Sequence, residues 1–448
     1  MQFSSKFGIE KKSIIDDFRL ALASRPVIII LSISAALRLL FILVILPSSP
    51  SEFGIDEGTY AILAKYVSQG LPVEYFPFYG AGLYNSMKSI SLPSALLIKI
   101  GIEELMAVRI ISSLYGLTSV LFLALAFIAY LRLLNKTTEE LVSCMDRKFI
   151  ILLAIFAFFP SNFIWSNIGL RESGSQFWLI VTFYLILKLL HSVGREQWKF
   201  ATLSTLALAI AYGTRPETAL VFSFLALLFS IGMLLINLRN FFPIIVIVLG
   251  TLAGQVLTSS TTTSTTTSTT PLTTTVARNV EEGLDSVKEK FLIIMNLENQ
   301  RNANSVDAKS ALPVTLCQNQ QDDIAIVIKC NLSELPFRLF AFLFRPMIFF
   351  DEGSKNLELA ALENLGWMIL IPFSIWVSLR KRQDVVDRTL NFYLISFVLL
   401  FSSAAALHEG NLGTGFRHKS TILWPLVFIL MIAPRLFPKS KREQTFFS

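Results

Sequence analysis

The sequence predicts an all-α membrane protein: a polytopic bundle of about ten transmembrane helices, with amphipathic interfacial helices in its first external loop. Of the 448 residues, 53% are hydrophobic and only 16% are charged, whereas soluble chains carry about 25% charged residues. The apolar residues also form runs of roughly 20, the length that a helix needs to cross a bilayer. Composition and run length together exclude an ordinary soluble domain.

Ten apolar runs are candidates for membrane helices. We expect the first to be retained rather than cleaved as a signal peptide, because a long polar and basic segment precedes it and no small-residue cleavage site follows. The fifth is short for a membrane span. The runs cover residues 26–46, 106–131, 149–165, 173–190, 199–213, 217–237, 242–257, 358–379, 390–407 and 420–437.

These runs divide the chain into three regions. Residues 1–257 form an N-terminal membrane module with seven helices, and residues 358–448 form a C-terminal module with three. Residues 258–357 between them form an external region that opens with a Thr/Ser tract reaching Thr275. The tract is too polar and uniform to bury, so we expect a disordered spacer, with O-linked glycosylation as the alternative.

The chain has three cysteines. Cys144 falls in an expected cytoplasmic loop and is predicted to be a free thiol. Cys317 and Cys330 share the external region, where oxidation is permitted. They can form a disulfide or stay as two free thiols, and the sequence does not decide between the two. No Cys/His spacing resembles a zinc site.

Lys and Arg residues are more frequent on one side of the predicted membrane helices. The positive-inside rule makes that side cytoplasmic and places both termini there. We expect an integral multi-pass protein of the bacterial plasma membrane, which is the inner membrane of the cell. The net charge of +7 reflects this bias and requires no nucleic-acid partner. The basic segments are the N-terminal tail, residues 132–148, 188–199, Arg239, residues 380–388 and the C-terminal tail.

The first external loop, residues 47–105, contains amphipathic stretches at 57–69 and 89–100. Apolar residues at helical spacing beside a membrane predict helices that lie along its surface. Asp56 and Glu57 stand where the first of these helices begins. A helix cap accounts for them, because Asp is a favoured cap and Glu suits a first turn. A carboxylate at the membrane surface also suits a general base, and the two roles are compatible.

Other charged residues are expected on the same external face. Charges at the hydrocarbon boundary are costly, so they tend to be paired or functional. The segment 408–419 also places glycines ahead of basic residues at the start of the last helix, which favours an anion such as phosphate; an ordinary glycine-rich turn is the alternative. The candidate substrate-binding residues are Tyr60, Arg171, Glu172, Arg215, Arg345, Arg417 and His418.

A substrate delivered by the membrane makes one chemistry consistent with these residues. The sequence has no P-loop and no dinucleotide fingerprint, and a sugar linked to a polyprenyl phosphate needs no nucleotide site. Arg residues can bind its anionic phosphate leaving group. Asp56 is the candidate general base for the acceptor hydroxyl, with Glu57 as second candidate or orienting group. Direct attack would invert the anomeric carbon, because no enzyme nucleophile is required.

Residues 54–80 resemble the first external loop of the GT-C glycosyltransferases. The likeness is closest to the branch that contains protein O-mannosyltransferases and lipid A aminoarabinose transferases. Asp56 matches the acidic position of that loop, which is catalytic or faces a metal, Glu57 matches the frequent second acid, and Tyr60 matches the aromatic residue. The resemblance implies transfer of a sugar from a polyprenyl-phosphate donor to a glycan, lipid or protein acceptor.

The likeness covers mainly residues 30–240, where the segments 109–134 and 212–216 also resemble the family pattern. The chain departs from that pattern where the fourth helix starts, with Arg171-Glu172 in place of a frequent Asp. The C-terminal soluble domain of some members is absent. Because the family contains metal-dependent and metal-independent enzymes, the resemblance does not decide whether this protein binds a divalent metal ion. No other cofactor is expected.

Two other functions compete with sugar transfer by a GT-C enzyme. An O-antigen polymerase or ligase also has many helices with Arg and His in a large late loop, which fits Arg345 and the segment 408–419, whereas the early acidic loop fits it less well. A flippase would move the lipid-linked sugar without chemistry. Arg38, inside the first helix, is the residue that most favours transport. A side chain that snorkels to the interface or that contacts a lipid phosphate explains it equally well.

Overall fold

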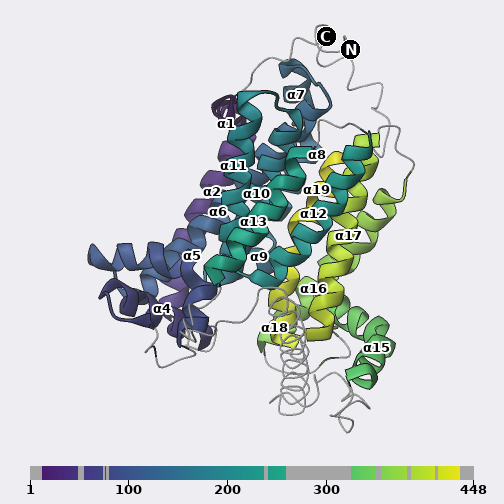
Figure 1. Cartoon of the computed structure of the whole chain (residues 1–448). Helices are drawn as coiled ribbons and strands as arrows, with labels where there is room; N and C mark the ends of the chain where they lie inside the picture. The colour runs from purple at the N-terminus through teal and green to yellow at the C-terminus, as the bar shows by residue number, and fades with distance from the viewer. Residues whose placement is uncertain are drawn as a thin grey trace, which may run out of the picture.

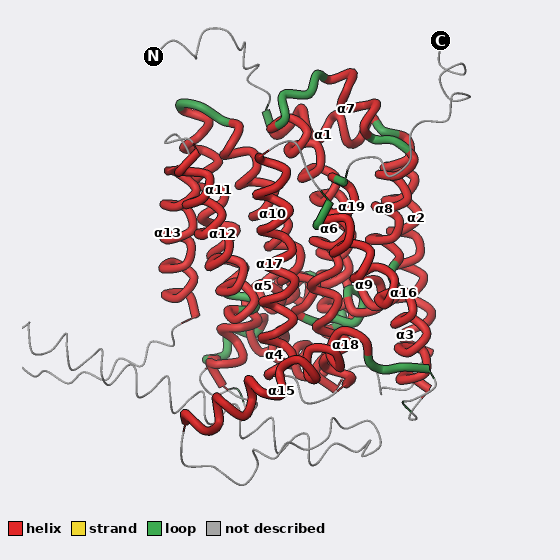
Figure 2. Tube along the Cα trace, turned by 90° about the vertical axis from the view of Figure 1, so that its right-hand side faces the viewer, coloured by secondary structure: helices red, strands yellow, loops and turns green. Residues whose placement is uncertain are grey.

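The computed structural model describes residues 13–48, 55–73, 76, 80–236, 241–258, 324–348, 351, 355–380, 385–408 and 412–433. Within these residues the structure is helical and contains no β-strand, as the tube in Figure 2 shows. This confirms the all-α fold class. The Thr/Ser tract and Cys317 lie outside the described residues, so the proposed disulfide does too, and Cys144 is a free thiol as expected.

Helical structure lies in each of the ten ranges that the apolar runs predict. The elements run side by side as a bundle (Figure 1). They are α2 (Arg25–Leu40), α6 (Glu104–Leu133), α8 (Arg147–Phe158), α10 (Arg171–His191), α11 (Arg195–Tyr212), α12 (Pro216–Ile236), α13 (Phe241–Thr258), α16 (Lys355–Ser378), α17 (Val385–His408) and α19 (Leu423–Ile432).

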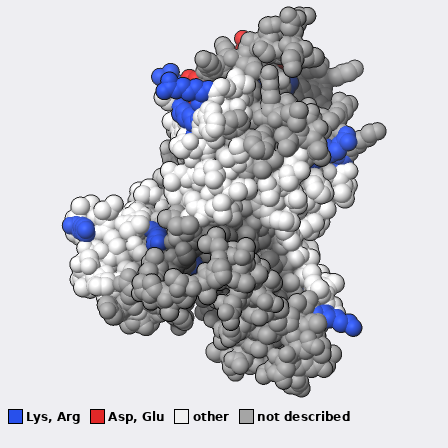
Figure 3. Space-filling model, viewed as in Figure 1, with Lys and Arg blue, Asp and Glu red and all other residues white. Residues whose placement is uncertain are grey.

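Five helical segments of the described chain are long and apolar enough to cross a membrane. On the face shown in Figure 3, uncharged residues cover the middle of the bundle and most Lys and Arg side chains lie toward its ends. Length, composition and this distribution support a membrane bundle. The five segments are Arg25–Ile45, Glu104–Leu133, Arg171–His191, Glu358–Ser378 and Val386–Leu407.

The third predicted span is broken in two. α8 ends at Phe158, and the short helix α9 (Pro160–Trp165) begins at Pro160. Proline has no N–H to continue a helix, and its ring pushes the preceding residue out of the helical region. Phe159 accordingly has φ −59° and ψ 125°. Its ring packs edge-on against Trp367 of α16, with ring centroids 4.8 Å apart.

The core of the bundle surrounds α19, whose residues are all buried. Phe183 of α10 packs against Trp424 and Phe428 of α19, with ring centroids 5.2 Å and 5.0 Å apart. Such aromatic pairs add to the stabilisation that burial gives. Arg38 is buried within this apolar bundle, where its guanidinium donates to Ser34 and Ser166. Its charge is therefore held by these hydroxyl groups inside the bundle.

The predicted amphipathic helices of the first external loop are present. α4 (Ile55–Ser68) and α5 (Gly80–Lys99) lie at one end of the bundle, opposite α1 (Ile14–Ala23) and α7 (Thr138–Cys144) (Figure 1). α15 (Ile324–Phe344) and α18 (Leu412–Lys419) lie at the same end as α4. We refer to it as the α4/α18 end.

A buried charge cluster joins three helices at the opposite end. The Asp17 side chain of α1 is fully buried, and its carboxylate lies 2.9 Å from Arg132 Nη2 and 2.9 Å from Lys188 Nζ. The Tyr184 hydroxyl donates to the same carboxylate at 2.9 Å. A buried charge needs such partners to offset its desolvation, so this cluster holds α1 against α6 and α10.

Asp17→Asn is expected to destabilise the protein by about 3–5 kcal/mol, because it leaves two buried cations without their carboxylate. The measurement is thermal unfolding in detergent, in which the variant should have a lower Tm. Lys136→Gln is the matched control, since it breaks an exposed pair with Glu140 at the same end and should change stability by at most about 1 kcal/mol. Equal Tm values for Asp17→Asn and the control would contradict this role.

Candidate functional site

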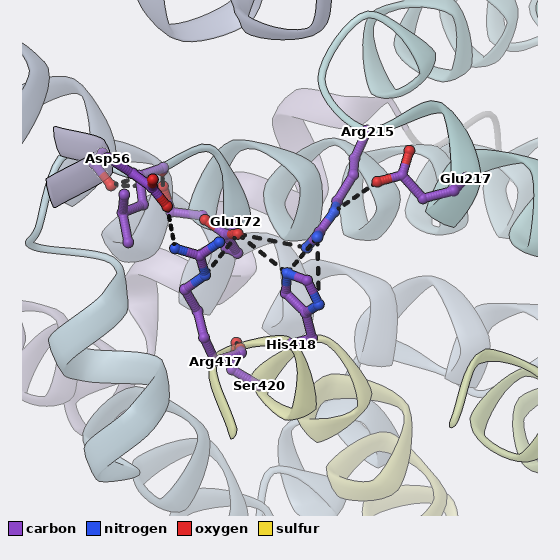
Figure 4. A network of polar contacts seen from close by, with 10 residues as sticks. Asp56, Glu172, Arg215, Glu217, Arg417, His418 and Ser420 are labelled. Atoms are coloured by element: carbon purple, nitrogen blue, oxygen red, sulfur yellow. Dashed lines mark hydrogen bonds and ion pairs between the residues drawn. The ribbon is translucent and has the colours of Figure 1, made fainter. Parts of the chain in front are cut away.

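Charged side chains from distant parts of the sequence meet at the α4/α18 end (Figure 4). Asp56 lies in the first turn of α4, and Glu172 lies in the first turn of α10. Arg215 immediately precedes α12, while Arg417 and His418 lie in the last turn of α18. The structure therefore brings together five of the nine residues that the sequence predicts for the site.

Glu172 is the centre of this cluster. Its side chain is 2% exposed, and its Oε1 lies 3.1 Å from Arg417 Nε, 3.5 Å from Arg215 Nη1 and 3.6 Å from His418 Nε2. A buried carboxylate without cations would be strongly unfavourable. The Arg417 and Arg215 side chains therefore lie beside Glu172 and offset the cost of burying its charge.

Arg417 joins Glu172 to Asp56. Its Nη1 donates to Asp56 Oδ2 at 2.8 Å, and the Asp56 side chain is 51% exposed. Burial lowers the pKa of Arg417, but the nearby carboxylates of Glu172 and Asp56 raise it by more than burial lowers it. The net pKa of Arg417 therefore lies above its ordinary value. Arg417 is a permanent cation that holds one buried and one accessible carboxylate.

Arg215 holds the far side of the cluster. Its Nε donates to Glu217 Oε1 at 3.0 Å, and its Nη2 donates to a ring nitrogen of His418. Because a guanidinium has no acceptor, the His418 nitrogen that faces it must accept. Glu217 was not among the predicted site residues. Its position two residues after Arg215 could have indicated this pairing from the sequence.

Tyr60 lies one turn after Asp56 on α4, and Arg171 directly precedes Glu172 in the first turn of α10, so both lie beside the cluster. Tyr60 is buried, and burial raises its pKa to about 12, so its phenol stays protonated at neutral pH. Arg171 makes no ion pair among the described residues, and its buried Nε has no hydrogen-bond partner there. Arg171 differs in this from Arg215 and Arg417, which both pair with Glu172.

Glu57 faces away from this cluster. Successive helical residues point about 100° apart, and Glu57 turns toward α6, where Arg109 donates to it through Nε at 2.7 Å and Nη2 at 2.9 Å. Gly169, with φ +43°, packs so closely that a Cβ would lie 3.1 Å from Glu57 Oε1. Glu57 is therefore committed to Arg109, which the sequence analysis did not pair with it, and is not placed as a second base.

Arg345 also lies apart from the Glu172 cluster, contrary to its predicted place. Its Nε donates to Asp351 at 2.9 Å and 3.1 Å, and the Met347 amide donates to the same carboxylate at 2.8 Å. Although burial raises the pKa of Asp351, Arg345 and the Met347 amide lower it, leaving a net pKa below the ordinary value. The guanidinium of Arg345 stabilises this turn.

The segment expected to be a glycine-rich turn contains a helix. Arg417, His418 and Lys419 lie in the last turn of α18, and the chain continues from there through a short 3-10 turn (Ser420–Ile422) into α19. The three residues therefore lie within one continuous helical run and not at a free helix N-terminus. Ser420 Oγ donates to the Arg417 carbonyl at 2.8 Å, and Gln176 of α10 donates to the Ser420 carbonyl at 3.2 Å. These bonds fix Arg417 and His418 beside Glu172.

A divalent metal ion has no evident site in the described part of the chain. No group of three or more His, Cys, Asp or Glu side chains is arranged there to hold one. Asp56 and Glu172 instead each lie against Arg417. The described residues of the site do not fit a metal, and the chemistry below uses none.

In comparisons with known proteins, no protein-family model matches this chain, and no curated protein or solved structure gives a match.

Asp56 and Glu57 are expected to differ in their effect on stability. Glu57→Gln breaks a buried bidentate pair whose side chains are 5% and 11% exposed, so it should cost several kcal/mol. Asp56→Asn breaks an accessible pair and should cost at most about 1 kcal/mol. Thermal unfolding of the two variants in one detergent makes the comparison. A larger loss of Tm for Asp56→Asn would contradict the assignment.

Lys419 lies next to the site and is fully buried. Its Nζ donates to Asn364 Oδ1 at 2.7 Å and to the Arg345 carbonyl at 3.2 Å, which connects α18 to α16. Burial lowers the pKa of Lys419 to about 7. Above about pH 7 the folded protein therefore favours the neutral amine.

Stability should rise with pH through Lys419. Between about pH 7 and about pH 10.4 the unfolded chain binds a proton at this amine that the folded chain does not hold, so the free energy of unfolding rises by up to ~1.4 kcal/mol per pH unit. Lys419→Met removes this titration. The Tm of the unmodified protein minus that of the variant should increase from about pH 7 to about pH 10. A constant or shrinking difference would contradict the buried neutral amine.

Proposed function

We propose that this protein is a GT-C type membrane glycosyltransferase that transfers a sugar from a polyprenyl-phosphate donor to an acceptor hydroxyl. One observation carries the proposal: half-exposed Asp56 pairs with part-buried Arg417, which also pairs with buried Glu172, at one end of an apolar helix bundle. An accessible carboxylate beside fixed cations suits proton removal from an acceptor next to an anionic leaving group. The resemblance of residues 54–80 to GT-C loops supports the same function.

In the proposed reaction Asp56 takes the proton of the acceptor hydroxyl. The acceptor oxygen then forms a bond to the anomeric carbon of the sugar. The bond between that carbon and the phosphate oxygen breaks, and its electron pair leaves with the polyprenyl phosphate. One displacement inverts the anomeric configuration, because no covalent enzyme intermediate forms.

Arg171 and Arg417 are the proposed phosphate ligands. Arginine binds phosphate through two parallel hydrogen bonds and stays charged at any working pH. Arg171 has no competing ion pair among the described residues, and Arg417 lies directly beside Asp56. Glu172, Arg215 and His418 are proposed to hold Arg417 in place, with the protonated Tyr60 as a hydrogen-bond donor nearby.

The proposed setting is a bacterial plasma membrane crossed about ten times, with both termini in the cytoplasm. The Lys and Arg distribution supports this orientation, and it puts the α4/α18 end on the extracytoplasmic face. α5 exposes Leu92 and Leu96, and exposed Ile100 directly follows the helix at the same spacing, which suits a helix in the membrane interface beside a lipid-borne donor. A glycan, lipid or protein acceptor would approach from outside.

Asp56→Asn is expected to lose transfer by about a hundred- to ten-thousand-fold, the usual contribution of a general base. The assay incubates the purified protein with a panel of radiolabelled polyprenyl-phosphate sugars and scores donor hydrolysis and transfer. Lys136→Gln, at the other end of the bundle, is the matched control and should keep full activity. Membrane insertion of Asp56→Asn should be normal.

One outcome would contradict the role of Asp56, and two would contradict the function itself. Retained transfer in Asp56→Asn would remove Asp56 as the base. No turnover of any donor, alongside measurable translocation of a lipid-linked sugar, would favour a flippase. Transfer of a preassembled polysaccharide, with no use of single-sugar donors, would favour the O-antigen polymerase or ligase type.

A further inference from the structure

Arg417 holds two carboxylates that differ in how firmly they are bound. Glu172 is buried and is close to Arg215 and His418 as well as to Arg417. Asp56 is half exposed, and among the described residues Arg417 is its sole hydrogen-bond or ion-pair partner. Exposed ion pairs contribute at most about 1 kcal/mol, whereas buried ones are costly to break. The bond to Asp56 is therefore the one that a ligand can displace.

A phosphate is suited to displace it. Phosphate and carboxylate oxygens compete for the same guanidinium donors, and both match the planar fork of arginine. Arg171 adds a second cation that no ion pair with a described residue occupies. Arg171 directly precedes Glu172 in the first turn of α10, and Arg417 Nε lies 3.1 Å from Glu172 Oε1, so both arginines border the same turn.

We propose that the Asp56–Arg417 pair is a latch that the donor phosphate opens. The phosphate takes Nη1 of Arg417 from Asp56, while Glu172 keeps Nε in place. Asp56 Oδ2 is then freed from its hydrogen bond to Arg417, so it can accept the acceptor proton only when a donor is bound. This inference rests on the proposed glycosyl transfer and assigns an order to it, with donor binding before deprotonation of the acceptor.

Removing the competing carboxylate should tighten phosphate binding. Asp56→Asn is expected to bind farnesyl phosphate, a short lipid phosphate used as the probe, about two- to five-fold more tightly than the unmodified protein. Titration calorimetry in detergent gives Kd directly. Lys136→Gln serves as the control for preparation and detergent, and its Kd should equal that of the unmodified protein.

A double variant separates the latch from general electrostatics. Asp56→Asn removes a negative charge, which would favour any anion nearby. In a protein that already carries Arg417→Gln there is no latch to open, so adding Asp56→Asn should tighten binding less than it does in the unmodified protein. The same tightening in both backgrounds would overturn the proposal, as would unchanged or weaker binding by the single variant.

The failure of the latch can be distinguished from the failure of the function. If the unmodified protein binds farnesyl phosphate and turns over a sugar donor, but Asp56→Asn shows no gain in affinity, the latch is wrong and the transferase stands. If the unmodified protein neither binds the probe nor uses any donor, both are wrong. A gain in affinity that requires Arg417 supports the latch.

Discussion

The burial of one carboxylate, that of Glu172, organises the α4/α18 end of the protein. A charge in this environment must be matched by cations, and they come from segments far apart in the sequence. Arg215 reaches Glu172 from the start of α12 and Arg417 from the end of α18. The bond that Arg417 also makes to Asp56 then joins α4 to the same point. Without Glu172, these segments would have no common anchor.

The two ends of the bundle use buried charge differently. Asp17 is surrounded by Arg132, Lys188 and Tyr184 and has no exposed surface, which suits a purely structural cluster. The Glu172 cluster instead ends in half-exposed Asp56. A network that is buried at its centre and accessible at its edge can position a reactive group and still admit a substrate.

The sequence predicted most of the helices, because apolar run length and composition reflect the membrane directly. It also predicted Asp56, Glu172, Arg215, Arg417 and His418 as members of one site. It could not assign partners: the pairing of Glu57 with Arg109, and of Arg345 with Asp351, depends on helix rotation and packing. The glycines before Arg417 suggested a turn, whereas packing against α10 and α15 stabilises a helix there.

The central claim is that the first turn of α4 lies beside the end of α18, and thiol cross-linking in native membranes tests it most directly. The protein would carry Asp56→Cys and Arg417→Cys, with Cys317 and Cys330 replaced by serine and Cys144 kept as an internal control on α7. A short bifunctional thiol reagent should link positions 56 and 417, as identified by mass spectrometry of the joined peptides. Absence of that link, or equal linkage of position 56 to Cys144, would contradict the account.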